Sequence, residues 1–218
     1  MALAFFPSRR SLPRQVARTL RRGYCDWMAE REWRRAGRPL PAPPPAKRRF
    51  LRDYARAHQL RVFVESGTLY GDTVAALRGA FDRLHSIELD DKLFAAAQER
   101  FAGDRKITLW HGDSGDVLER VLAAVDAPAL FWLDGHYSGG GTGRGVEDAP
   151  IRRELALIAR HALQSRHHVI ADDARLFDGT NGYPHAGDME EWTVQLGFGS
   201  CTRINDFFCI HAGANGGL

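Results

Sequence analysis

Short apolar runs alternate with amphipathic segments from residue 47 to residue 211, and this alternation predicts strands separated by helices. The predicted strands cover 61–65, 84–88, 106–110, 129–133, 167–171, 200–204 and 206–211, and the predicted helices cover 47–58, 72–80, 91–102, 114–124, 150–163 and 187–196. Strands and helices that alternate in this way favour a mostly parallel sheet with helices on both faces. We therefore predict a doubly wound α/β fold.

The last two predicted strands are connected differently from the others. Only a short turn around Asn205 and Asp206 separates them, which predicts a hairpin. A terminal hairpin adds an antiparallel strand to an otherwise parallel sheet. The predicted fold is thus a seven-stranded, mostly parallel sheet that closes with a C-terminal antiparallel hairpin.

A basic extension, residues 1–46, precedes this domain, which we place at residues 47–218. Residues 1–50 hold thirteen Lys and Arg against three acids, which leaves 17 bases (30 − 13) and 24 acids (27 − 3) for the rest of the chain. The hydrophobic spacing predicts an amphipathic helix over 11–35. Its apolar stripe consists of Val16, Leu20, Tyr24 and Trp27 or Met28.

Five prolines between residues 39 and 45 predict an extended linker of polyproline II type after that helix. Two interpretations of the extension stay open. It can be an arm that packs on the core or on a second subunit of a homo-oligomer, or it can contact an anionic surface such as membrane headgroups or nucleic acid. An Arg-rich start is also typical of an organellar transit peptide, but Asp26, Glu30 and Glu32 speak against that.

Residues 62–74 carry the clearest sign of a ligand site. An apolar run ends at Glu65, and Gly67 and Gly71 follow before a segment that can begin a helix. Glycine tolerates positive φ and close backbone approach, and a helix N-terminus presents unpaired N–H groups. The spacing Glu-x-Gly-x-x-x-Gly differs from the Gly-x-Gly-x-x-Gly of dinucleotide sites. A carboxylate here would repel a diphosphate but would tolerate an ammonium or sulfonium group, which favours S-adenosylmethionine over NAD; an ordinary turn with structural glycines is the alternative.

Further acids follow the next two predicted strands. Glu88 ends the second strand, where an α/β nucleotide site places a carboxylate that accepts from ribose hydroxyls. Asp113 and Ser114 follow the third strand, near the place where an adenine amino group would need an acceptor. Solvated strand ends or helix caps remain the simpler explanation, and Ser114 suits an N-cap well.

These segments together resemble the class I S-adenosylmethionine-dependent methyltransferases over residues 61 to about 211. The resemblance rests on residues 64–71, 86–90, 112–114 and 131–136. It implies that Glu65 and Gly67 border the methionine part of the cofactor, that Glu88 binds the ribose and that Asp113 lies by the adenine. The implied cofactor-binding residues are Glu65, Gly67, Thr68, Tyr70, Gly71, Asp72, Glu88, Asp113, Ser114 and Asp134.

A second group of acids follows the fourth and fifth predicted strands. Asp134 comes after the fourth, Asp172 and Asp173 come after the fifth, and oxygen-rich clusters of this kind suit Mg²⁺, Ca²⁺ or Mn²⁺. The pattern is similar to that of the catechol-type, metal-dependent O-methyltransferases, which implies that these three aspartates bind a divalent cation. Unlike those enzymes, this chain has no lysine nearby to act as base. His136 is the candidate base instead, and Asp134 is a second candidate catalytic residue.

Two irregular segments predict the surroundings of the acceptor. Residues 139–145 are rich in glycine and predict a mobile loop, and Tyr183 and His185 lie in a second loop over the same edge. We expect a small-molecule or glycan acceptor that is methylated on a hydroxyl oxygen. An NAD-dependent oxidoreductase and a non-catalytic binding module of the same fold are the competing hypotheses.

Composition agrees with one main domain and an extension. The chain has 218 residues, 44% of them hydrophobic, and no apolar run that could span a bilayer or serve as a secretory signal. The three cysteines, Cys25, Cys201 and Cys209, show no metal-binding spacing and predict reduced thiols. We therefore expect a cytoplasmic protein.

Overall fold

The computed structural model describes residues 14–135, 150–180 and 182–211. Contacts divide the chain into two compact units, Met1–Lys47 and Arg48–Leu218. Within the described residues, no helix is long and apolar enough to cross a membrane.

The first unit is built around one long helix, α1 (Arg14–Arg35), which confirms the helix predicted over 11–35 for its described part. The ion pair of Glu30 with Arg34 supports its last turns, with 2.6 Å between Oε1 and Nη2. Beyond the helix, the indole N–H of Trp33 donates to the carbonyl of Pro39 at 2.7 Å. Tyr24 and Trp27 of the predicted apolar stripe are exposed.

The helix after the prolines, α2 (Pro44–Ala57), begins inside the predicted linker, so the linker prediction is wrong for Pro44 and Pro45. Proline is well suited to the first helical turn, because the N–H group that it lacks would have no intrahelical partner there. The extended segment therefore ends before Pro44.

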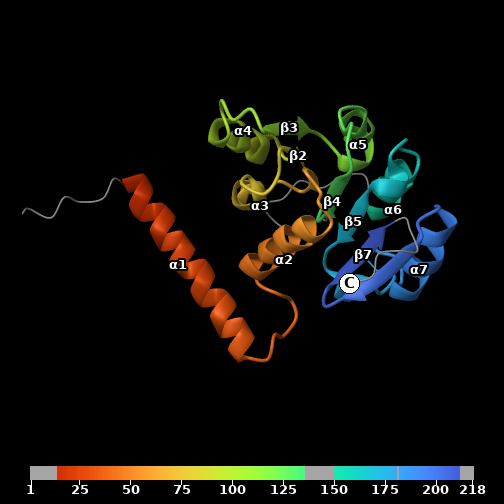
Figure 1. The fold of residues 1–218 in the computed structure, drawn as a ribbon, viewed down its shortest axis with the longest axis horizontal. Helices are drawn as coiled ribbons and strands as arrows, with labels where there is room; N and C mark the ends of the chain where they lie inside the picture. Colours follow the sequence, from red (N-terminus) through yellow and green to blue (C-terminus); the bar gives the residue numbers. More distant parts are fainter. Residues whose placement is uncertain (1–13, 136–149, 181, 212–218) are drawn as a thin grey trace, which may run out of the picture. The chain divides into compact units, whose positions relative to one another are not determined.

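The second unit contains a seven-stranded sheet in the order β3-β2-β1-β4-β5-β7-β6 (Figure 1). Its strands are β1 (Val62–Ser66), β2 (Arg83–Glu88), β3 (Ile107–His111), β4 (Ala129–Leu133), β5 (His168–Ala171), β6 (Ser200–Ile204) and β7 (Phe207–His211). The first five strands are parallel, and β7 is antiparallel to both β5 and β6. The predicted seven-stranded fold with a C-terminal hairpin is confirmed.

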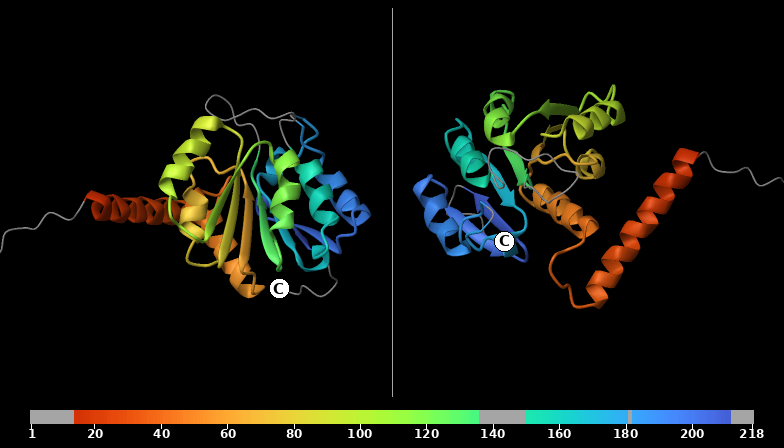
Figure 2. Two further views of the ribbon diagram at one scale, coloured as in Figure 1. Left: turned by 90° about the horizontal axis from the view of Figure 1, so that it is seen from above. Right: turned by 180° about the vertical axis from the view of Figure 1, so that it is seen from behind.

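The helices of this unit are α3 (Asp72–Leu77), α4 (Asp91–Arg100), α5 (Ser114–Ala123), α6 (Ile151–Ala159) and α7 (Ala186–Gln195), with short 3₁₀ turns at Gln164–Arg166 and Ala174–Leu176. They lie in two layers with the sheet between them (Figure 2). The predicted helices over 72–80 and 150–163 are longer than the observed α3 and α6. The other predicted bounds in this unit agree within two or three residues.

Both faces of the sheet are buried in separate hydrophobic clusters. Val64, Phe131 and Val169 pack under α5, α6 and α7, whereas Phe63, Leu130 and Ile170 pack against α3 and the second unit's part of α2. All five residues of β1 and of β4 are buried, as expected for central parallel strands. Phe131 and Trp132 are core residues.

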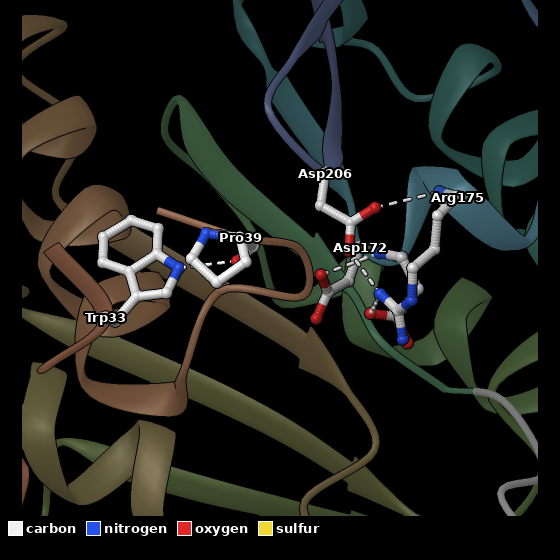
Figure 3. Close-up of polar contacts among 6 residues, drawn as sticks. Trp33, Pro39, Asp172, Arg175 and Asp206 are labelled. Atoms are coloured by element: carbon white, nitrogen blue, oxygen red, sulfur yellow. Dashed lines mark hydrogen bonds and ion pairs between the residues drawn. The ribbon is translucent and has the colours of Figure 1, made fainter. Parts of the chain in front are cut away.

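An arginine connects the end of β5 to the terminal hairpin. The hairpin turns at Asn205, whose φ is 55°, and the next residue, Asp206, is fully buried. Arg175 donates from its backbone N–H to Asp206 at 2.9 Å, and its guanidinium pairs with Asp206 and, at 2.7 Å, with Asp173 (Figure 3). The two buried carboxylates therefore share one cation.

Replacement of Arg175 by alanine should lower the free energy of unfolding by about 3 kcal/mol, because Asp173 and Asp206 would stay buried without their partner. Chemical denaturation would measure the loss. Arg61→Ala is the matched control, since the Arg61 pair with Asp82 is exposed on both sides and its removal should change stability far less. Equal small losses in the two variants would contradict the structural role of Arg175.

A buried histidine makes stability depend on pH. The Nδ1 atom of His167 accepts from the backbone N–H of Ala129 at 3.2 Å, and its Nε2 lies 2.7 Å from Nδ1 of His161. Burial, reinforced by His161, His168 and Arg166, lowers the pKa of His167 to about 4. Between about pH 4 and 6.5 the unfolded chain therefore binds a proton that the folded chain does not, so stability rises with pH across this window.

The variant His167→Asn should reduce the slope of the unfolding free energy against pH by up to about 1.4 kcal/mol per pH unit. This is the value for one proton that binds only to the unfolded chain. Urea denaturation at several pH values between about 4.5 and 6.5 would give the slope separately from the overall loss of stability. A variant with the slope of the original protein would show that His167 is protonated equally in both states.

Candidate functional site

The predicted site residues gather at one edge of the sheet. Strands β1 to β5 are parallel, so their carboxyl ends meet at the same edge, and each has an acid at or near its end. Ligands in open α/β sheets bind outside these ends. The acids at or after the five strand ends are Glu65, Glu88, Asp113, Asp134 and Asp172.

Backbone conformation and packing within the protein explain both glycines of the β1–α3 turn. Gly67 has φ 89°, and a Cβ there would lie 2.9 Å from the carbonyl oxygen of Asp134. Gly71 has φ 69°, and a Cβ there would clash with the ring of Phe101. Both positions therefore require glycine before any ligand is considered. Close packing of β1 against the end of β4 sets the shape of this turn.

The other residues predicted in this turn differ in their surroundings. The Thr68 hydroxyl is buried and hydrogen-bonds that of Ser86. Asp72 pairs with Arg100 at 2.6 Å at the start of α3. Tyr70 is 67% exposed, so its ring is open to solvent at the edge of the site.

Glu65 is a buried carboxyl group inside the sheet edge. Its Oε1 accepts from the hydroxyl of Ser86 on β2 at 2.7 Å. Burial raises the pKa of Glu65 to about 8; the Ser86 bond opposes this rise and the charge of Glu88 adds to it. At neutral pH the group therefore holds a proton to a large extent unless a cation lies nearby.

Glu88 fixes the turn after β1 to the end of β2. Its Oε2 accepts from the backbone N–H of Leu69 at 2.7 Å, and its Oε1 accepts from that of Asp90 at 2.9 Å. Each carboxylate oxygen can accept a second hydrogen bond. The side chain is buried yet stands at the strand end, where it can reach a ligand above the turn.

The third strand end is organised as a helix cap. Asp113 is the N-cap of α5 and accepts from the N–H of Gly115 at 2.9 Å, while Ser114 is the first helical residue. The helix-cap explanation therefore holds for Asp113, whereas Ser114, which also suits an N-cap, is not the cap. Aspartate and serine are about equally favoured as N-caps, so residue type alone does not predict which of these two adjacent residues is the cap.

Asp134, Asp172 and Asp173 converge as predicted. One carboxylate oxygen of each lies within 4.8 Å of the others, Asp172 and Asp173 are buried, and Asp134 is half-buried. Asp172 also accepts from the N–H of Asp173 at 2.7 Å, which helps to hold Asp173 at φ 55°. Arg175 compensates part of the charge, because it pairs with Asp173 (Figure 3).

A small hollow adjoins these aspartates, with room for about one water molecule at 20 Å³. Its walls include Asp134, Gly135, Ile151, Glu154, Asp172 and Tyr183; we call it the Asp134 hollow. Burial raises the pKa of the Tyr183 phenol, and Asp173, Asp134 and Asp172 add to this. Tyr183 thus lies beside the acids, whereas His185 is exposed and precedes α7.

One residue of the hollow was missed by sequence reasoning. Glu154 lies in the first turn of α6 and is 1% exposed. Burial raises its pKa to about 7; the hydroxyls of Ser114 and Ser66 oppose the rise, Asp113 adds to it and Arg153 opposes it. The sequence feature that could have identified it is its spacing: Glu154 falls on the same helix face as Ile151, Leu155 and Ile158, which are buried.

His136 and the glycine-rich residues 139–145 lie outside the described residues. The role of His136 as base therefore stays a prediction. The described part of the site consists of the strand ends, the β1–α3 turn and the Asp134 hollow.

No protein-family model matches the chain, and no curated protein matches it either. Solved structures match its fold. The SAH-bound methyltransferase PaMTH1 of Podospora anserina is 14% identical, with a TM-score of 0.56 over 97% of this chain and 100% of that one. The O-methyltransferase TomG of Streptomyces achromogenes, involved in tomaymycin synthesis and solved with SAM, is 19% identical, with a TM-score of 0.53 over 86% and 89%.

An O-methyltransferase of Bacillus cereus in complex with SAH is 15% identical, with a TM-score of 0.56 over 85% of this chain and 88% of that one. At these identities the similarity concerns the fold. The chain has the seven-stranded, Rossmann-like fold of these S-adenosylmethionine-dependent methyltransferases.

Proposed function

We propose that the protein transfers a methyl group from S-adenosylmethionine to a hydroxyl oxygen of a small molecule or sugar. One observation carries the proposal: acids lie at or near the carboxyl ends of the strands β1 to β4 at a single sheet edge, in a fold shared with SAM- and SAH-bound methyltransferases. The terminal hairpin supports it, since a dinucleotide-binding sheet has no need of that strand arrangement.

The cofactor would lie along the strand ends. Each oxygen of Glu88 accepts one backbone N–H group and can accept a second hydrogen bond, which a ribose hydroxyl would donate. We assign Asp113 and Ser114 to the adenine, and Glu65 and Gly67 to the methionine part. Thr68, Tyr70, Gly71 and Asp72 form the rest of the turn around it.

The electrostatics of Glu65 favour a cationic ligand over a diphosphate. A buried carboxylate is costly, as the raised pKa of about 8 shows, and a sulfonium or ammonium group nearby would offset that cost. A pyrophosphate at the same turn would add two negative charges beside Glu65 and Glu88. This supports S-adenosylmethionine rather than NAD as the cofactor.

Methyl transfer from a sulfonium is an in-line displacement, so alignment of the acceptor oxygen supplies much of the acceleration. Tyr183 and the acids beside it border the place where that oxygen would lie. His136 is the proposed base for the hydroxyl proton, and Asp134 is the second proposed catalytic residue. TomG and the Bacillus cereus protein are described as O-methyltransferases, which supports oxygen as the acceptor atom.

The donor set of Asp134, Asp172 and Asp173 fits a divalent cation such as Mg²⁺. All three offer hard carboxylate oxygens, and these converge within 4.8 Å. Arg175 pairs with Asp173 and is shared with Asp206. When bound, the metal would lower the pKa of an acceptor hydroxyl.

Calorimetry with S-adenosylmethionine, SAH and NAD tests the function directly. We expect the first two to bind and NAD not to bind. Glu88→Ala should weaken binding of both by about 1.5–3 kcal/mol, because a charge-assisted hydrogen bond to the ribose is lost. Glu88→Gln, which keeps one acceptor oxygen, should lose less. Asp91→Ala removes a nearby exposed acid and is the control; unchanged affinity in Glu88→Ala would refute the ribose assignment.

Titration with Mn²⁺, followed by electron paramagnetic resonance, tests the metal site without an acceptor. Asp134→Asn and Asp172→Asn should each weaken Mn²⁺ binding by more than about tenfold, since even loss of an outer-shell partner costs that much. Asp188→Asn, an exposed acid on α7, is the control. Equal Mn²⁺ affinities in all variants would remove the metal from the proposal.

A further inference from the structure

Glu154 is a buried carboxyl group that the proposed function has not used. It lies in the first turn of α6, on the face that packs against α5 and the sheet, with Ile151 and Leu155 as buried neighbours. Within the described residues, its Oε1 makes no hydrogen bond and is shielded from solvent. An unpaired buried carboxyl oxygen is costly, so its presence calls for a partner that the described residues do not supply.

The surroundings of Glu154 place it under the strand end that begins the ligand-binding turn. Its carboxyl group lies beside the hydroxyls of Ser66, the last residue of β1, and Ser114, the first of α5. Ser66 Oγ also makes no hydrogen bond among the described residues. The carbonyl of Ser66 accepts from the N–H of Asp134 at 3.3 Å, so this polar group adjoins the ends of both β1 and β4.

Two buried carboxyl groups thus flank the end of β1 from opposite faces of the sheet. Successive strand residues point to opposite faces, so Glu65 and Ser66 point away from each other. Glu65 has a donor, the Ser86 hydroxyl, whereas Oε1 of Glu154 has none in the described part of the chain. Arg153, the nearest base along α6, is engaged with Asp113 and Asp116 on α5.

The hollow beside Glu154 limits what can approach it. Glu154, Asp134 and Gly135 share the walls of the Asp134 hollow, which has room for about one water-sized group. An ammonium group has that size, carries a positive charge and donates hydrogen bonds. A sulfonium carries three carbon substituents and donates none, so it cannot satisfy Oε1.

We propose that Glu154 binds the ammonium group at the methionine end of the cofactor, with Ser66 as its neighbour in the site. The inference rests on the proposed function, since it requires an S-adenosylmethionine-type ligand at this edge. It adds a residue from α6 to a site otherwise built from the strand ends and the turn after β1. The raised pKa of Glu154 agrees with a group that becomes fully charged only beside a cation.

Three ligands with the same nucleoside separate the possibilities. S-Adenosylmethionine carries an ammonium and a sulfonium, SAH carries only the ammonium, and 5′-methylthioadenosine carries neither. In calorimetry on the full chain, Glu154→Gln should lower the affinity for the first two by about tenfold or more, the lower limit for a charge-assisted bond. Its affinity for 5′-methylthioadenosine should be unchanged.

Controls keep this result distinct from a folding defect. Glu119→Gln alters an exposed acid on α5 and should affect none of the ligands. Glu154→Asp keeps the charge but withdraws it by one methylene, and should weaken the same two ligands. The ligand-free melting temperature of Glu154→Gln should not fall, because the variant removes a buried acid.

Equal losses for all three ligands, or no loss for any, would overturn the assignment. A loss confined to S-adenosylmethionine would overturn it too, because it would assign Glu154 to the sulfonium. If the unaltered protein bound neither S-adenosylmethionine nor SAH, the proposed function itself would fail.

Discussion

Compensation of buried negative charge at one edge of a parallel sheet is the constraint on which this structure depends. Parallel strands bring their carboxyl ends together, and here those ends carry acids that the helices enclose. A buried carboxylate is stable only with donors or a counter-charge. The chain meets this need differently at each acid: a hydroxyl for Glu65, two backbone N–H groups for Glu88 and a shared arginine for Asp173.

Each compensating bond also holds a structural element in place. Glu88 joins the turn after β1 to the end of β2 by accepting from the N–H groups of Leu69 and Asp90, so the turn and the strand end form one unit. Arg175 joins the end of β5 to the terminal hairpin through Asp206. The site and the fold are therefore stabilised by the same contacts, and a change in one acid alters both.

Much of this could be predicted from the sequence, because apolar runs such as 129–133 are unambiguous and because strand order brings their ends together. The convergence of Asp134, Asp172 and Asp173 followed from the same rule. Details that depend on a choice between adjacent residues could not be predicted. The start of α2 at Pro44 and the cap at Asp113 rather than Ser114 are both of this kind, since neighbouring residues of similar preference compete for one position.

Glu154 escaped prediction for a different reason, which bears on function. Glu154 is spaced with Ile151, Leu155 and Ile158 on the apolar face of α6, yet spacing alone does not show whether an acid there is enclosed; the approach of Ser66 and Ser114 from other elements shows that it is. A carboxyl group left without a full set of partners lowers the stability of the ligand-free protein. A cationic ligand would recover that free energy on binding, whereas a neutral ligand of the same shape would not. Incomplete compensation at this edge would thus give selectivity for a cationic ligand at the proposed site.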